Sequence, residues 1–260
     1  MVKTSKPAKI TQYKNEEISS PEEEVIVEKP VSLTVNGNVW LTFMCTPNDL
    51  EALAAGFLFN ENVIESKDDI ADIYICENQD NVDIWLNKKA EEPNNWRRTS
   101  GCTGGYTAAV LEEIKPVKSK GMTLSPESIL RLIRQLFDSQ EIYRKTGGVH
   151  SSGLSDGDKI LIVTEDVGRH NTLDKIAGKY ILEDVKGKPM VLMSTGRISS
   201  EMLQKAARLQ VPVLVSRTSP TSMSVELAKK LGITLIGYAR GHRFNIYTHP
   251  ERIELKKEPA

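Results

Sequence analysis

The chain has 260 residues, 39% of them hydrophobic, which is long enough for one large domain or two modest ones, and we expect two. Its 34 Lys and Arg balance 35 Asp and Glu to a net charge of -1, which excludes a partner drawn by overall charge, such as nucleic acid or an anionic membrane. No stretch has the pattern of a signal peptide or a membrane span, and Cys45, Cys76 and Cys102 give no disulfide framework, so we expect a cytoplasmic protein.

Residues 1–24 are polar, rich in Lys and Glu and without periodicity, which predicts a loose, flexible N-terminal arm. Residues 25–120 are expected to form an α+β domain. It opens with alternating apolar and polar residues on both sides of Asn36-Gly37, which predicts a β-hairpin. A helix should follow in TPNDLEALAAGFLFNENVI, with Thr46 as its cap, and DIYICE and NVDIWLN predict two more strands.

The second domain is expected over residues 121–260. It begins with a helix in SPESILRLIRQLFD, which has a serine cap, a proline in its first turn and an apolar stripe. The stripe consists of Ile129, Leu132, Ile133 and Leu136. Short apolar runs such as KILIVT, PMVLMS, VPVLVS and ITLIGYA then alternate with amphipathic segments. This alternation predicts a sheet with substantial parallel pairing and helices packed on it.

Basic residues follow several of the predicted strands, in the loops EDVGRHN, TGRIS, RTSPTS and RGHRFN. The carboxyl ends of parallel strands meet at one edge of a sheet, where ligands of open α/β folds bind. Helix N-termini, which favour anions, are expected at three of these loops. We therefore expect a phosphate-bearing ligand, although for any one of these arginines taken alone a solvated loop residue is the commoner role. The candidates are Arg169, His170, Arg197, Arg217, Arg240, His242 and Arg243.

Cys102 lies in RRTSGCTGGYTA, among glycines and after two arginines. Glycines keep a thiol accessible, and the arginines, if they fold back, favour the thiolate. The local sequence leaves two interpretations open, a reactive thiol and a solvent-facing loop cysteine. Cys45 and Cys76 end apolar runs and are interpreted as inert packing residues.

Other candidate groups carry less information. His150 and His170 are possible acid-base groups, although a structural hydrogen bond is the commoner role for a histidine. Glu165 and Asp166 are neighbours in a predicted strand, so they should face opposite ways and not act as a carboxylate pair. The Cys and His spacing matches neither a structural zinc site nor the zinc deaminase pattern, so no metal site is expected.

Longer motifs carry a resemblance to a known family. GVHSSGLSDGDKILIVTEDVGRHNTLDKIAGKYIL, STGRISSEMLQKAARLQVPVLVSRTSP and GYARGHRFNIYTHPERI resemble the formate dehydrogenase accessory proteins, the FdhD family, over most of residues 147–253. PNDLEALAAGFLFNENVI and SGCTGGY extend the resemblance into the first half. It implies a sulfurtransferase that accepts sulfur as a persulfide from a cysteine desulfurase and passes it to the molybdenum cofactor required by formate dehydrogenase. It also implies a homodimer and, for the second domain, a three-layer, cytidine-deaminase-like α/β fold.

The resemblance also assigns residues. Cys102 falls on the family's persulfide-carrying cysteine, and Gly105 stands where many members have a second cysteine, so a two-thiol mechanism within this loop is not expected. The family's segment for the bis-molybdopterin guanine dinucleotide form of the cofactor matches Tyr238, Ala239, Arg240, Gly241, His242 and Arg243. The alternative function is a non-catalytic escort that binds this cofactor and docks on the dehydrogenase, with Cys102 incidental.

Overall fold

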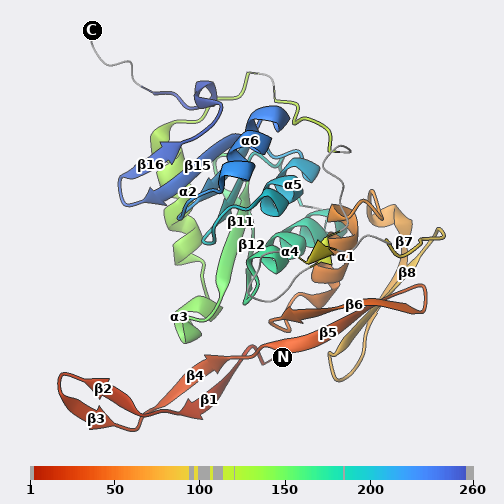
Figure 1. Cartoon of the computed structure of the whole chain (residues 1–260), viewed down its shortest axis with the longest axis vertical. Helices are drawn as coiled ribbons and strands as arrows, with labels where there is room; N and C mark the ends of the chain where they lie inside the picture. Colours follow the sequence, from red (N-terminus) through yellow and green to blue (C-terminus); the bar gives the residue numbers. More distant parts are fainter. Residues whose placement is uncertain are drawn as a thin grey trace.

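The computed structural model of the chain describes residues 3–93, 97–98, 106–107, 114–119, 121–183 and 185–255. Within these residues there are six α-helices and a mixed set of sheets, of which the largest has six strands (Figure 1). No helix in the described part of the chain combines the length and apolar character needed to cross a membrane.

The N-terminal arm differs from the sequence prediction, because it has regular structure. Two short antiparallel ladders follow one another along it, β1 with β4 near the body and β2 with β3 at the tip. Their bounds are Ser5–Lys9 (β1), Gln12–Lys14 (β2), Glu17–Ser19 (β3) and Glu22–Ile26 (β4). The tip turns at Asn15 and Glu16, both with positive φ, as a tight type I′ hairpin requires. Sequence periodicity missed these strands because neither face is buried, so nothing selects for alternation.

The next unit is a four-stranded sheet covered by one helix. The predicted hairpin at Asn36-Gly37 is confirmed as the turn between β5 and β6, and the strand order is β6-β5-β8-β7. The bounds are Lys29–Val35 (β5), Asn38–Cys45 (β6), Leu50–Asn60 (α1), Ile70–Ile75 (β7) and Asn81–Leu86 (β8). The prediction of Thr46 as helix cap is wrong. The helix begins at Leu50, after Asp49, and Thr46 is buried in contacts with the rest of the chain.

The six-stranded sheet has the order β12-β11-β13-β14-β15-β16. Strands β13, β14 and β15 pair in parallel, which confirms the predicted parallel core, while β11 and β16 run antiparallel to their neighbours. The strand bounds are His150–Ser155 (β11), Ile160–Asp166 (β12), Val191–Ser194 (β13), Val213–Ser216 (β14), Thr234–Arg240 (β15) and Arg243–Ile246 (β16). The helix bounds are Pro126–Asp138 (α2), Ile142–Thr146 (α3), Arg169–Leu182 (α4), Ser200–Arg208 (α5) and Ser222–Leu231 (α6).

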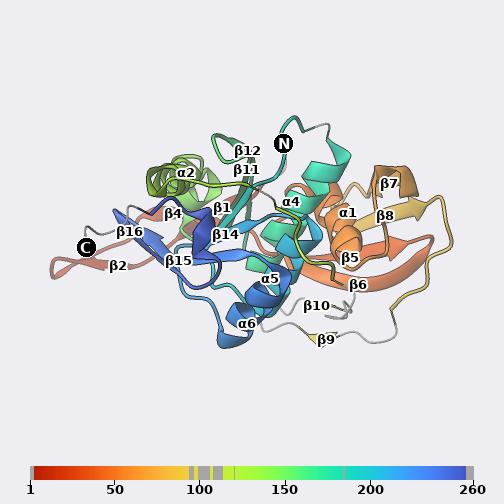
Figure 2. The same cartoon turned by 90° about the horizontal axis from the view of Figure 1, so that it is seen from above.

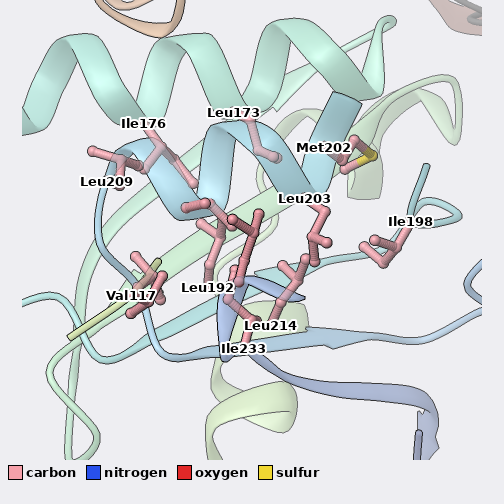
Figure 3. Close-up of a cluster of buried hydrophobic side chains, with 14 of the residues drawn as sticks. Val117, Leu173, Ile176, Leu192, Ile198, Met202, Leu203, Leu209, Leu214 and Ile233 are labelled. Carbon is pink, nitrogen blue, oxygen red and sulfur yellow. The ribbon is translucent and has the colours of Figure 1, made fainter. Parts of the chain in front are cut away.

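Helices lie on both faces of this sheet, which makes three layers (Figure 2). Successive strand residues point to opposite faces, so Val213 joins the core under α2 and Leu214 joins the core under α4 and α5. Figure 3 shows the second core, where Leu173 of α4 and Leu203 of α5 point toward Leu192 of the sheet. The predicted stripe of α2 is buried throughout, and Ser125 accepts the Ser128 N–H as its cap.

Helices α1 and α4 join the two units through an unusually close contact. A Cβ added to Gly56 would lie 1.8 Å from the Asp174 carbonyl oxygen, and one added to Gly178 would lie 1.8 Å from the Ala52 carbonyl oxygen. Only glycine allows the two backbones to approach this closely. The arrangement fixes the first sheet against the face of the second that carries α4.

A buried polar cluster lies beside this contact. Lys175 of α4 forms an ion pair of 2.6 Å with Asp166, and both side chains are 0% exposed. The Lys175 ammonium also donates to the Thr46 carbonyl and to Asn48 Oδ1, and Asp166 accepts the Thr46 N–H, the Gly168 N–H and Asn171 Nδ2. Backbone and side-chain groups of the first unit thus satisfy the buried charges of Lys175 and Asp166 in the second, so neither charge is left unpaired in the interior.

Candidate anion-binding site

The sheet topology brings the predicted basic loops to one edge. Because β12 and β13 both run antiparallel to β11, they point the same way, and β14 and β15 are parallel to β13. The carboxyl ends of β12, β13, β14 and β15 therefore meet at the same edge, together with the first residues of β11 and β16. The sequence prediction that these loops crowd together is confirmed at the level of topology.

Two adjoining cavities open along this edge. The larger, of about 480 Å³, lies between the end of α2, the region of α3 and the start of β11. Its wall includes Gln140, Tyr143, His150, Thr195 and Thr218. The smaller, of about 270 Å³, lies between α2 and the end of β15. Phe137 and Arg217 line both cavities, so the two cavities lie side by side.

Arginines dominate the smaller cavity. Arg134 comes from α2, Arg217 from the end of β14 and Arg240 from the end of β15. The guanidinium carbon of Arg217 lies 5.1 Å from the centre of the Phe137 ring, a cation–π contact that fixes the side chain between the two cavities. Three guanidinium groups on one small cavity, without a carboxylate in its wall, form a site that favours an anion with several oxygens, such as a diphosphate.

The predicted segment 238–243 lies at this edge, but its members differ in what they can contact. Arg240 and Gly241 line the smaller cavity, whereas Ala239 is fully buried in the core beneath α2. Tyr238 is 37% exposed and adopts a positive φ, with its N–H donated to the Thr218 carbonyl. His242 and Arg243 are exposed in the turn and at the start of β16. Only part of the segment is therefore in a position to touch a ligand in the cavity.

Small residues hold the loops of this edge in place. The Ser194 hydroxyl accepts the Gly196 N–H, and the Ser216 hydroxyl donates to the Gly196 carbonyl. A Cβ at Gly196 would lie 3.0 Å from Arg169 Cδ and 3.4 Å from His150 Nδ1. Gly196 therefore lets these two side chains approach the β13 turn, and with it the wall of the larger cavity.

The surroundings of His150 and His170 lower the pKa of both imidazoles, so both are neutral near pH 7. Burial, reinforced by the Arg169 charge, lowers the pKa of His150, which lines the larger cavity. Burial and the nearby charge of Lys205 lower the pKa of His170 to about 3. His170 is 5% exposed, so of the two only His150 faces a space that a ligand can enter.

The adjacent acids face opposite ways, as predicted. The Glu165 carboxylate accepts the N–H groups of Glu141, Ile142 and Tyr143 and so caps the short helix α3. Asp166 points to the buried cluster around Lys175. Both carboxylates are committed to backbone and ion-pair contacts, so neither is available for acid-base chemistry at the cavity.

The three cysteines do not line either cavity in the described part of the chain. Cys102 and Gly105 are outside the described residues, between the paired strands Arg97–Arg98 (β9) and Tyr106–Thr107 (β10). Burial and the Asp166 charge raise the pKa of the Cys45 thiol to about 12, as expected of an inert core cysteine. Cys76 is only partly buried and donates to Asp80. Among the described residues, no group of three or more His, Cys, Asp or Glu side chains could hold a metal ion.

Sequence reasoning missed the contribution of α2 to the site. Arg134 and Phe137 were expected only as part of a helix, and Gln140 was not singled out. Phe137 follows Ile133 by one helical turn, so the apolar stripe continues to the end of α2. That continuation was the available signal that the helix end packs near the strand ends. Arg197 is exposed, and neither it nor the buried Arg169 lines either cavity.

Comparison with known proteins places the chain in a family. The model of the FdhD/NarQ family matches residues 26–254. A protein from Bacillus licheniformis named Sulfur carrier protein FdhD is 37% identical over 253 residues, covering 95% of this chain and 96% of the relative. The protein of the same name from Bacillus subtilis strain 168 is 34% identical over 250 residues, covering 94% and 95%.

A solved structure agrees with these relatives. The crystal structure of a protein from Desulfotalea psychrophila, described as a candidate formate dehydrogenase accessory protein, is 31% identical to this chain. It superposes with a TM-score of 0.81, covering 96% of this chain and 100% of that one. The family match extends through both sheets and through the arginine-lined edge. The chain therefore belongs to the FdhD/NarQ family.

Proposed function

We propose that this chain is a sulfur carrier that serves formate dehydrogenase. The names of the relatives support a sulfur carrier, and the observation that carries the proposal is the cavity walled by Arg134, Arg217 and Arg240. A protein that moves sulfur to a nucleotide-bearing acceptor needs a site for that acceptor's phosphates. The three guanidinium groups supply such a site at the edge of the sheet where α/β proteins bind ligands.

The acceptor in this proposal is the molybdenum cofactor in its bis-molybdopterin guanine dinucleotide form, as the resemblance implies. Each of its diphosphates is an anion with several oxygens, which the arginines of the smaller cavity favour, and Arg240 belongs both to that cavity and to the segment of residues 238–243. A cytidine-deaminase-like assignment of the second unit fits the three-layer arrangement around the six-stranded sheet. Fold alone does not carry the function, which rests on the site.

Cys102 carries the sulfur in this proposal. Its thiolate attacks the terminal sulfur of a persulfide on a cysteine desulfurase. A new sulfur–sulfur bond forms at Cys102, the bond in the donor breaks, and the donor cysteine leaves as a thiolate, so no external oxidant is needed. Gly105 cannot form a disulfide with Cys102, so a single thiol performs the transfer. The setting is the cytoplasm, where thiols stay reduced.

The nucleotide site is tested by calorimetry with GDP as the probe. Replacement of Arg134, Arg217 or Arg240 by Ala removes a charge-assisted contact of roughly 1.5–3 kcal/mol, so we expect affinity to fall by more than about tenfold in each variant. Arg197→Ala is the matched control, because Arg197 is exposed and lines neither cavity. Unchanged GDP affinity in all three variants would remove this cavity from the site.

One variant distinguishes the escort alternative from the sulfur carrier. Cys102→Ala leaves the cavity intact, so it should bind GDP like the parent protein and yet fail to restore formate dehydrogenase activity in cells that lack the native protein. Full restoration by Cys102→Ala would favour the escort, in which the chain binds the cofactor and delivers it without sulfur transfer.

A further inference from the structure

The four-stranded sheet of the first unit is covered by a helix on one face only. Its strands direct one set of side chains into the core under α1, and α1 packs on β7 and β8. Figure 1 shows α1 on one side of this sheet and, in the described part of the chain, no helix on the other. A sheet face that stays in water is normally polar, because its side chains alternate with those of the core. The outer face of this sheet departs from that rule.

Large hydrophobic side chains stand on this outer face. Val39 of β6 is 64% exposed, Tyr74 of β7 is 59% exposed and Trp85 of β8 is 48% exposed. Their sequence neighbours Ile73 and Ile84 point the other way, into the core under α1. Tryptophan and tyrosine are enriched at the energetic centres of protein interfaces, where the ring is buried against a partner. The composition of the face therefore indicates contact with a protein.

Each aromatic side chain of the face lies opposite a carboxylate. Tyr74 is the cross-strand partner of Asp83, and Trp85 is the cross-strand partner of Asp72. The Trp85 indole N–H donates to Asp83 Oδ2 at 3.2 Å. Neither carboxylate forms an ion pair within the described part of the chain. An arginine or lysine side chain that lies on an aromatic ring can pair with the adjacent carboxylate, so this arrangement favours a cationic side chain.

The hairpin formed by β7 and β8 is acidic along its whole length. Residues 68–86 contain six acidic residues and no Lys, Arg or His, and the acids are Asp68, Asp69, Asp72, Glu77, Asp80 and Asp83. The chain as a whole has a net charge of only -1, so the acidity is a local property of this hairpin. Charge of one sign on an exposed surface attracts a partner surface of the opposite sign and repels others. The outer face therefore fits a basic protein surface.

We propose that this outer face, which consists of Val39, Asp72, Tyr74, Asp83 and Trp85, docks a basic segment of the sulfur donor. The inference rests on the proposed function, in which the donor is a cysteine desulfurase. Arginine or lysine side chains of the donor lie over Trp85 and Tyr74 and pair with Asp72 and Asp83. Val39 extends the apolar contact to β6.

The place of the face in the molecule favours the donor over the dehydrogenase that holds the acceptor. The arginine-lined cavity lies beside α2, whereas the four-stranded sheet packs through α1 against α4, on the other face of the six-stranded sheet. A protein that docks on the outer face therefore leaves the cavity open. Strand β8 also leads along the chain to Cys102, which follows Leu86 by sixteen residues. The donor thus docks on the unit from which the segment with the carrier cysteine continues.

Docking is measured by calorimetry with each purified cysteine desulfurase of the same organism. The full chain carries Cys102→Ala in this experiment, so that no sulfur is transferred. Tyr74→Ser with Trp85→Ser should raise the dissociation constant by more than about tenfold, because both aromatic anchors are lost. Asp72→Lys, a single change at an exposed position, should also weaken binding and should reduce the loss of affinity that added salt causes.

A matched control changes an exposed hydrophobe and an exposed acid outside the outer face. Met223→Ser with Asp158→Asn serves this purpose, because Met223 is 59% exposed, like Tyr74, and the Asp158 side chain is 88% exposed. Both residues belong to the second unit, and neither lines a cavity described above. The control should bind the desulfurase like the parent.

Sulfur transfer gives a second readout in chains that retain Cys102. Persulfide formation is followed with two donors, the desulfurase with cysteine and the small molecule glutathione persulfide. In the second reaction the terminal sulfur passes to Cys102 and glutathione leaves as a thiolate, without a docked protein. Tyr74→Ser with Trp85→Ser should slow loading from the desulfurase by more than about tenfold and leave loading from glutathione persulfide at the parental rate.

The outcomes separate docking from sulfur transfer. Parental affinity for the desulfurase in both face variants would overturn the docking proposal, and so would a parent chain that binds no desulfurase or equal slowing with both donors. Formate dehydrogenase bound through the same residues, in place of the desulfurase, would overturn it as well. If the desulfurase binds through the face but Cys102 gains sulfur from neither donor, the docking proposal stands and the sulfur-carrier proposal fails.

Discussion

Replacement of Lys175 by Met should destabilise the chain severely. Lys175 and Asp166 are both 0% exposed and 2.6 Å apart, and the ammonium also donates to the Thr46 and Glu165 carbonyls. Methionine has a similar length but no charge, so Asp166 would remain buried without its counter-ion. Loss of one partner of a buried ion pair costs about 3–5 kcal/mol, which is a large part of the roughly 5–15 kcal/mol that stabilises a typical domain.

The measurement is urea denaturation of the single variants Lys175→Met and Asp166→Asn and of the double variant. In the double variant neither charge is stranded, so we expect its loss of stability to be smaller than the sum of the single losses by at least about 1 kcal/mol. Lys88→Met is the matched control, because Lys88 pairs with Asp69 at the surface and should cost about 0–1 kcal/mol. A loss below about 1 kcal/mol for Lys175→Met would refute the view that this pair joins the two units.

Three further predictions concern the described part of the chain. His170 has a pKa near 6.5 in the unfolded chain and about 3 in the folded chain, so the free energy of unfolding should fall as the pH drops through this window, by up to about 1.4 kcal/mol per pH unit. His170→Gln should remove this contribution, which denaturant titrations at pH 7 and pH 5 would measure. Gly178→Ala should lower the melting temperature much more than Lys179→Ala, because its Cβ would lie 1.8 Å from the Ala52 carbonyl oxygen, and equal melting temperatures would contradict the close helix contact. Gly196→Ala should weaken GDP binding measured by calorimetry, since its Cβ would lie 3.4 Å from Nδ1 of His150, which lines the larger cavity beside the arginines, and would displace that wall. Parental affinity would argue against this packing.

The sequence allowed prediction of the elements that bury one face or both. The stripe of α2, the hairpin at Asn36-Gly37 and the parallel strands β13, β14 and β15 all have apolar patterns that their burial requires. Strand β11, with the sequence HSSGLS, was missed although it lies inside the sheet. Its small polar residues find partners only in the folded chain, as the Ser152 and Thr172 hydroxyls show, and no periodic pattern in one segment reveals such pairing.

The candidate site was predictable only in part for a similar reason. The rule that parallel strands end at one edge brought the arginines of four loops into consideration, and Arg217 and Arg240 do line the cavities. The rule could not separate them from Arg197, which lines neither cavity, because the direction of each side chain depends on the packing of its own loop. It also could not supply Arg134, which comes from a helix on one face of the sheet.

The central claim, that Cys102 carries sulfur, is tested most directly by mass spectrometry of the protein after incubation with a cysteine desulfurase and cysteine. Peptide mapping should then find one added sulfur atom on Cys102 that a thiol reductant removes. Cys45 should stay unmodified, because its buried thiol has a pKa of about 12 and is protonated at neutral pH. Added sulfur on Cys45 or Cys76, with none on Cys102, would contradict the account.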